Sequence, residues 1–244
     1  MKTLGIIPSR YASTRFPGKP LIDIGGKTMI QRVYEQAKKA TSLTEVVVAT
    51  DNEKIFNHIK SFGGSVVMTS SSHESGTDRC AEVLSKTSGN YDFVINIQGD
   101  EPFINPEQIN QTSACFNDEK TDIATLIKKI DAEEELFNPN RPKVEVDENS
   151  FAKMFSRKAI PELLNVAKSE WLSKHDFYKH IGIYGYRSSV LKEISQLQPS
   201  PLEIEERLEQ LRWLENGYKI KVATTDFEAV AIDTPEDLEK ITFK

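Results

Sequence analysis

The chain has few cysteines, no long hydrophobic run and no excess of basic residues. Its two cysteines, Cys80 and Cys115, lack the spacing of metal ligands and fit a reducing compartment better than a disulfide scaffold. No stretch is apolar for long enough to span a bilayer, and no apolar signal segment precedes the first predicted strand, so we expect a cytoplasmic protein that does not bind membranes. The net charge of −6 disfavours general adhesion to nucleic acid, so any polyanion needs a local basic pocket.

Two common nucleotide-binding signatures are also absent. The segment Gly26-Lys27-Thr28 has the ending of a P-loop, but Leu21 stands where the first glycine of that pattern belongs. No G-x-G-x-x-G occurs either. A nucleotide site in this chain must therefore be built in another way. With 244 residues, of which 38% are hydrophobic, the chain can form one large α/β domain or two small ones.

Apolar, strand-like runs alternate with helical patterns over the first 130 residues. The pattern predicts strands at Leu4–Pro8, Glu45–Thr50, Ser65–Met68, Phe93–Gln98 and Asp122–Ile130, and helices at Met29–Ala40, Asn52–Phe62, Asp78–Lys86 and Pro106–Asn117. This alternation predicts an α/β fold with a mainly parallel, Rossmann-like sheet flanked by helices on both faces. Ligands of such sheets bind at the carboxyl ends of the strands, and polar residues cluster at those ends here.

The pattern changes after about Asn138. Strands are expected at 143–147, 152–156 and 178–187, and we interpret residues 139–187 as a β-rich subdomain inserted within a single domain that spans residues 1–244. We expect this insertion to expose strand edges and Trp171 and to make a homodimer contact. The chain then returns to a helix at Glu203–Asn216, a strand at Lys219–Thr224 and a last helix that begins at Thr234-Pro235.

The loop that follows the first strand carries three cations and no carboxylate. Gly18 lets its backbone approach a ligand closely, and hydroxyls add hydrogen-bond donors to the backbone amides. Such a loop predicts a binding site for a nucleoside triphosphate, and the alternative is an ordinary basic loop between a strand and a helix. The charges and hydroxyls come from Arg10, Arg15, Lys19, Ser13 and Thr14.

Two aspartates are candidate metal ligands. A bound triphosphate normally needs Mg²⁺, which keeps several waters and requires only one or two carboxylates from the protein. Asp100 follows a buried strand and Gly99, and Asp233 precedes the last helix. The alternatives are a simple turn aspartate for Asp100 and capping of the last helix for Asp233.

Taken in order, these segments resemble the CMP-Kdo synthetase family, the 3-deoxy-manno-octulosonate (Kdo) cytidylyltransferases of lipopolysaccharide precursor synthesis. The resemblance covers essentially the whole chain. The resemblance implies a fold of the nucleotide-diphospho-sugar transferase type. The matching segments are IPSRYASTRFPGKPL at 7–21, ATD at 49–51, SGTDR at 75–79, NIQGDEP at 96–102, FSR at 155–157, HIGIYGY at 180–186, LEQLR at 208–212 and DTPEDL at 233–238.

The resemblance implies that CMP is transferred from CTP to the anomeric 2-hydroxyl of Kdo, with release of pyrophosphate. It implies that Arg10, Lys19 and Asp100 are catalytic and that Asp100 and Asp233 bind Mg²⁺. The implied nucleotide contacts are Arg10, Ser13, Arg15, Lys19, Ser75, Gly76, Arg79 and Gln98. It also points to a homodimer.

For the sugar acid, the resemblance implies contacts from Gln98, Arg157, His180, Tyr184 and Glu209. A guanidinium suits the carboxylate of Kdo, and neutral or anionic acceptors suit its hydroxyls. Competing interpretations are a partnered strand histidine for His180, core packing for Tyr184 and a charged helix face for Glu209.

The segment from Glu162 to Phe177 matches the family poorly and lacks an arginine that could contact the sugar. An amino-substituted octulosonate therefore stays open as the substrate. Two further alternatives are a cytidylyltransferase for sialic acids and a nucleotide-sensing module without catalysis, because a fold does not fix a function.

Overall fold

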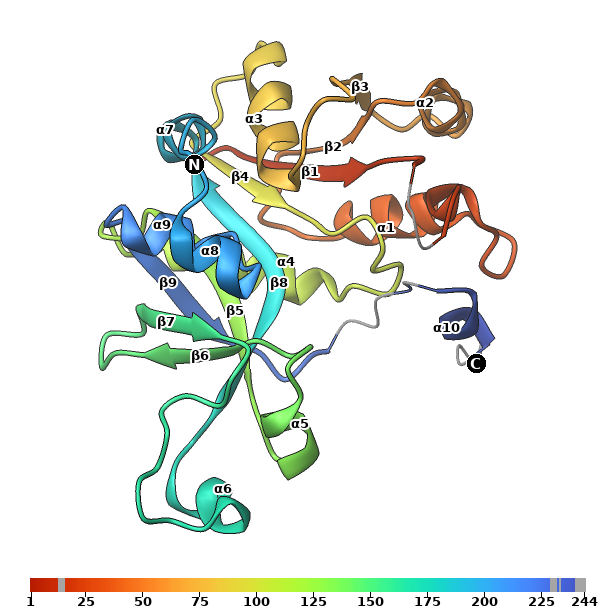
Figure 1. Cartoon of the computed structure of the whole chain (residues 1–244). Coiled ribbons are helices and arrows are strands. Elements are labelled where there is room, and N and C mark those ends of the chain that lie inside the picture. Colours follow the sequence, from red (N-terminus) through yellow and green to blue (C-terminus); the bar gives the residue numbers. More distant parts are fainter. Residues whose placement is uncertain (13–15, 229–231, 233, 240–244) are drawn as a thin grey trace.

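One nine-stranded sheet runs through the part of the chain that the computed structural model describes, which is residues 1–12, 16–228, 232 and 234–239. Its main path has the order β3-β2-β1-β4-β8-β5-β9, and the hairpin of β6 and β7 joins it through β8 (Figure 1). Every strand of the main path except β8 runs in the same direction, which confirms the predicted mainly parallel sheet. The strands are β1 (Thr3–Ser9), β2 (Glu45–Thr50), β3 (Val66–Met68), β4 (Phe93–Asn96), β5 (Ile123–Lys129), β6 (Lys143–Val146), β7 (Ala152–Ser156), β8 (Tyr178–Arg187) and β9 (Ile220–Thr224).

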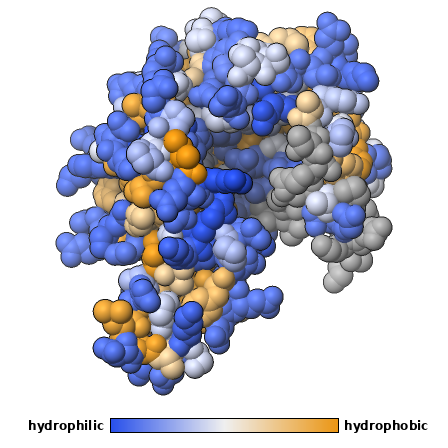
Figure 2. Space-filling model, in the orientation of Figure 1, coloured by the Kyte–Doolittle hydropathy of each residue, from blue (hydrophilic) through white to orange (hydrophobic). Residues whose placement is uncertain are grey.

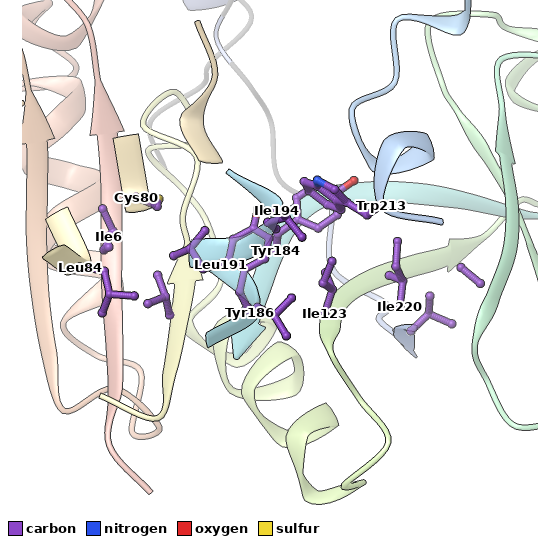
Figure 3. Packing of buried hydrophobic residues seen from close by; sticks show 14 of the residues in the cluster. Ile6, Cys80, Leu84, Ile123, Tyr184, Tyr186, Leu191, Ile194, Trp213 and Ile220 are labelled. Carbon is purple, nitrogen blue, oxygen red and sulfur yellow. The ribbon is translucent and has the colours of Figure 1, made fainter. Parts of the chain in front are cut away.

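Helices cover both faces of this sheet, and each face has its own hydrophobic core. The core on one face takes side chains from α3, α7 and α9, some of which are labelled in Figure 3, and the core on the other face takes them from α1, α2 and α4. The helices are α1 (Met29–Ala37), α2 (Glu53–Ser61), α3 (Gly76–Lys86), α4 (Pro106–Ala114), α5 (Glu133–Phe137), α6 (Trp171–Lys174), α7 (Ser188–Ile194), α8 (Pro201–Glu206), α9 (Gln210–Glu215) and α10 (Pro235–Glu239). None of the helices in the described ranges is both long and apolar enough to cross a membrane.

Two predictions about the second half of the chain are wrong. The helix expected at Glu203–Asn216 is two helices, α8 and α9, because Arg207 adopts a left-handed conformation with a φ of 54° and ends α8. Strand β8, which we placed in the insertion, is instead a central strand of the main sheet between β4 and β5. The inserted residues are therefore continuous with the sheet.

Trp171 is buried and not exposed as expected. Only 4% of its surface is accessible, and its ring lies 5.9 Å from Phe177 and 5.6 Å from Phe137, between ring centroids. These residues form a small separate core at the lower end of the molecule in Figure 1. Residues 158–177, which contain α6 and lie between β7 and β8, form an arm. The large apolar side chain that is exposed in this arm is Leu164, with 77% of its surface accessible. Cys80 and Cys115 are both buried and unpaired, as predicted.

A β-bulge in β8 shapes the sheet where the site residues lie. The register between β5 and β8 shifts between Thr125 and Leu126, and the hydroxyl of Thr125 lies 3.0 Å from Nε2 of His180. Aromatic rings of Phe155 and Tyr184 pack against His180, with centroids 5.4 and 5.1 Å away. Burial lowers the pKa of His180 to about 4, because the charged imidazolium loses its hydration there.

This burial predicts a pH dependence of stability. In the unfolded chain His180 has an ordinary pKa near 6.5, so between about pH 6.5 and pH 4 the unfolded chain takes up a proton that the folded chain does not. Above pH 6.5 the contribution of neutral His180 to the free energy of unfolding is complete. As the pH falls from 6.5 toward 4, the free energy of unfolding decreases by roughly 1.4 kcal/mol per pH unit. Urea unfolding of the wild type and of His180→Gln at several pH values measures it. We expect the wild type to lose more stability on acidification, and parallel curves would contradict the prediction.

Candidate functional site

The predicted basic loop and the predicted carboxylate meet at the carboxyl ends of β1 and β4. These two strands are adjacent and parallel, so the segments that follow them leave the sheet at the same edge. Nζ of Lys19 lies 2.8 Å from Oδ2 of Asp100, and the two side chains are 12% and 31% exposed. Figure 2 shows that the surface of the molecule is hollowed near the centre of the view and that the residues around this hollow are mostly hydrophilic. The structure therefore brings a cation and an acid that are 81 residues apart into one partly open site.

Gly99 allows this convergence. A Cβ atom at this position would lie 2.6 Å from the carbonyl oxygen of Pro8, a distance that real Cβ atoms essentially never show. Only glycine therefore lets the turn after β4 pass so close to the end of β1. Gly99 therefore makes room for the neighbouring strand.

The C-terminal segment also reaches this site. The backbone N–H of Ile232 donates a 3.0 Å hydrogen bond to the carbonyl oxygen of Asp100, and the Ile232 side chain is fully buried beside Ile24 and Met29. Asp233, the second predicted metal ligand, is the next residue in the sequence but lies outside the described residues. So do Ser13 and Arg15 of the basic loop, and the predictions for these three residues are untested.

Arg10 lies between the end of β1 and the segment that precedes α3. It is exposed, and its Nη1 is 3.5 Å from the carbonyl oxygen of His73. Ser75, two residues later, is the N-cap of α3 and forms a capping box in which its side chain accepts from the backbone N–H of Asp78. A Cβ on Gly76 would lie 3.3 Å from Nδ2 of Asn96, so this turn is packed against the end of β4. Arg10, Ser75 and Gly76 thus flank the same edge of the sheet as Lys19 and Asp100.

Arg79, a predicted nucleotide contact, is buried and paired with residues that follow β2 and β3. Its side chain is 1% exposed, Nη2 donates to Asp51 at 3.0 Å, and Nη1 donates to the hydroxyl of Thr69. An arginine that is buried and paired in this way holds α3 against the ends of β2 and β3. Its hydrogen bonds go to the protein, and a contact of the guanidinium with the nucleotide stays a prediction.

Tyr184 of β8 and Glu209, which directly precedes α9, are the next two predicted sugar contacts. Tyr184 is 8% exposed, and its hydroxyl has no hydrogen-bond partner among the described residues. Burial raises the pKa of Glu209, while a hydrogen bond from Thr77 and the charge of Arg212 oppose that shift. Burial, followed by the neighbouring Tyr186 and the charge of Glu209, raises the pKa of Tyr184. An unpartnered hydroxyl beside a carboxylate can accept and donate hydrogen bonds to a sugar hydroxyl.

The remaining predicted sugar contacts are held by the protein backbone. Nε2 of Gln98 donates to the carbonyl oxygen of Gly182 at 2.8 Å, which orients its amide beside the bulge of β8. Arg157 donates to the carbonyl oxygens of Glu206, Pro139 and Arg207, at 2.6, 3.0 and 3.3 Å. Arg157 thereby fastens the insertion to the corner between α8 and α9, and its contact with a sugar carboxylate stays a prediction.

The structure adds one acidic residue that the sequence analysis did not single out. Glu101 is partly buried directly after Asp100, and burial together with the charge of Asp100 raises its pKa to about 7. The sequence does show a second acid after Asp100, in the segment GDEP. This segment looks like an ordinary polar turn, because no neighbouring residue indicates that Glu101 is buried.

The carboxylate of Asp100 fits a Mg²⁺ ion bound together with a triphosphate. It is a hard oxygen donor, it is partly exposed toward the hollow, and phosphate oxygens and waters complete such a coordination shell. Among the described residues, no group of three or more His, Cys, Asp or Glu side chains could hold a metal ion without other ligands.

Comparison with known proteins identifies the family. The model of the family described as Cytidylyltransferase matches residues 4–220. A 3-deoxy-manno-octulosonate cytidylyltransferase of Parabacteroides distasonis is 60% identical over 244 residues, which cover 98% of this chain and 96% of that protein. The protein of that name from Bacteroides thetaiotaomicron is 58% identical over 242 residues, with coverages of 98% and 96%.

Solved structures agree with these sequence relatives. The structure of a CMP:2-keto-3-deoxy-manno-octonic acid synthetase complexed with CTP superposes with a TM-score of 0.90 at 41% identity, covering 98% of this chain and 96% of that one. A 4-diphosphocytidyl-2C-methyl-D-erythritol synthase from Anaerococcus prevotii is 12% identical with a TM-score of 0.62, over 98% and 96% of the two chains, and shows a shared fold alone. The chain belongs to the 3-deoxy-manno-octulosonate cytidylyltransferase family.

Proposed function

We propose that this chain transfers CMP from CTP to the anomeric 2-hydroxyl of 3-deoxy-D-manno-octulosonate, giving CMP-Kdo and pyrophosphate. Relatives at 58–60% identity carry the name of this activity, and a structural relative at 41% identity is a CTP complex. The observation that carries the proposal is the 2.8 Å contact between Lys19 and Asp100 at the edge of the sheet where Arg10 also emerges. The activity is that of a nucleotidyltransferase, and we place it in lipopolysaccharide synthesis in the cytoplasm.

In this reaction the hydroxyl oxygen forms a bond to the α-phosphorus while the bond between that phosphorus and the α–β bridging oxygen breaks. Negative charge develops on the bridging oxygen and on the departing pyrophosphate. Lys19 and Arg10 stand where a triphosphate would follow β1, and their fixed positive charges stabilise that developing charge. Asp100, with Asp233 in the adjoining segment, would hold Mg²⁺, which when bound supplies charge neutralisation and lowers the pKa of the attacking hydroxyl.

A pyrophosphate-release assay with CTP and Mg²⁺ tests the proposed substrate. We expect turnover with Kdo and weak or no turnover with a sialic acid, because the residues facing the sugar belong to segments typical of the Kdo family. The 8-amino form of Kdo is the third substrate to include, since residues 162–177 carry no arginine. Preference for 8-amino-Kdo or for the sialic acid would replace the proposed substrate, and silence with all three sugar acids would favour a nucleotide sensor.

Replacing Asp100 tests the metal assignment. Asp100→Ala is expected to lower Mg²⁺-dependent turnover by at least about 10²-fold, the size seen when a preorganised electrostatic group is removed. Its carboxylate is 31% exposed, so the midpoint of thermal unfolding should change little. The matched control is Asp131→Ala, which removes an exposed carboxylate from a loop after β5. Activity close to wild type in Asp100→Ala would end the metal assignment.

We further propose that the chain forms a homodimer through the arm that contains α6. A hollow of about 530 Å³ opens between this arm and β6, lined by apolar side chains such as Leu172 and Tyr178 and by charged groups. Apolar residues gather at the lower end of the molecule in Figure 2, and Leu164 is 77% exposed. An exposed apolar surface of this kind is typical of an interface between subunits.

Light scattering of the purified protein measures the oligomeric state. We expect a dimer for the wild type and a shift toward monomer for Leu164→Glu, because a buried charge disfavours association. Ile204→Glu is the control, since Ile204 is an equally apolar residue, 65% exposed on α8, away from the arm. A monomeric wild type would remove this proposal without affecting the proposed activity.

A further inference from the structure

A chain of buried polar side chains runs beneath the candidate site. The hydroxyl of Thr77 lies 3.0 Å from Oε2 of Glu209 and 3.4 Å from the hydroxyl of Tyr186, which also hydrogen-bonds the side chain of Asn96. Thr77 is 1% exposed and Tyr186 is fully buried. The four residues come from β4, β8, α3 and the residue that precedes α9, so one hydrogen-bonded chain joins four elements.

The direction of the protons along this chain follows from its acceptors. The carboxylate of Glu209 can only accept, so the hydroxyl proton of Thr77 points to it. Thr77 has no second proton, and Tyr186 must therefore donate in the contact between the two hydroxyls. Each member thus has one orientation that satisfies its neighbour, and Thr77 is the link through which Glu209 is fixed to the sheet.

The carboxylate of Glu209 accepts from Thr77 and from the side chain of Ser75, and a carboxylate has further lone pairs with which it can accept from a ligand. Thr77 engages Oε2, and Tyr184, whose hydroxyl has no hydrogen-bond partner among the described residues, stacks on Tyr186 with ring centroids 6.2 Å apart. Figure 3 shows Tyr184 and Tyr186 side by side, with Trp213 of α9 covering them, and the Tyr184 and Trp213 ring centroids are 5.1 Å apart. A hydroxyl group of a polyol can therefore donate to Glu209 and accept from Tyr184.

Thr77 also stands at the start of α3, two residues after Ser75. The turn that is predicted to meet the cytidine and the carboxylate that is predicted to meet the sugar are therefore joined by one side chain. We propose that Thr77 is a positioning residue that orients Glu209 toward the sugar acid and holds α9 to the nucleotide-side turn of α3. This proposal rests on the proposed function.

The experiment compares Thr77→Val with Thr77→Ser in the pyrophosphate-release assay, varying CTP and Kdo separately. Valine keeps the shape of threonine but removes the hydroxyl, and serine restores the hydroxyl. We expect Thr77→Val to raise KM for Kdo about tenfold, as for loss of one hydrogen bond to a charged group, with KM for CTP within about twofold of wild type. Thr77→Ser should return KM for Kdo to near the wild-type value.

Two further variants separate positioning from simple destabilisation. Thr112→Val removes another fully buried threonine hydroxyl, one that donates to the backbone of α4, and should leave both KM values unchanged. Should Thr77→Val fail to fold, Tyr186→Phe tests the same chain by removing the donor to Thr77, and we expect the same rise in KM for Kdo alone.

Three outcomes would overturn the inference: an unchanged KM for Kdo, equal increases in both KM values, or no rescue by serine. The proposed function fails in a different way, through absence of turnover by the wild type with Kdo, and the role of Thr77 in orienting the sugar then falls with it.

Discussion

The close parallel approach of β1 and β4 is the constraint on which the site depends. The two strands are hydrogen-bonded neighbours, so the basic loop after β1 and the acidic turn after β4 leave the sheet at one edge. The absence of a side chain at Gly99 lets that turn pass over the carbonyl of Pro8. Lys19 can then reach Asp100 at 2.8 Å. A side chain at position 99 would push the turn away from β1 and so separate Lys19 from Asp100.

Much of this arrangement could be predicted from the sequence, because hydrophobic periodicity reports on each element separately. The first five strands and the alternation that makes them parallel were visible in the apolar runs. The break at Arg207 was not, because its neighbours favour helix and a non-glycine residue at a φ of 54° has no sequence signal. The central place of β8 was missed for a related reason: which strands pair is decided by contacts between distant segments, and periodicity carries no record of them.

The same limit explains which site residues the sequence could identify. Motif order placed Arg10, Lys19 and Asp100 at strand ends, and the sheet then brought them together. The order of the motifs could not distinguish an arginine that faces a ligand from one whose hydrogen bonds are made within the protein. Arg79 belongs to the same motif as Ser75, yet its guanidinium forms an ion pair with Asp51, which directly follows β2. In both cases the sequence shows an arginine in a polar segment, and only the three-dimensional pairing decides its role.

The buried polar groups around β8 differ in whether the protein already provides their hydrogen-bond partners. A buried hydroxyl without a partner costs on the order of 1–3 kcal/mol, and the hydroxyl of Tyr184 has no partner among the described residues. A substrate hydroxyl that pairs with it recovers that free energy on binding, whereas a substrate lacking the hydroxyl does not. Thr77 and Tyr186, by contrast, already have their hydrogen bonds within the protein. Partnered groups therefore fix the geometry, and under the proposed function the hydroxyl of Tyr184 is the group that would discriminate between sugars.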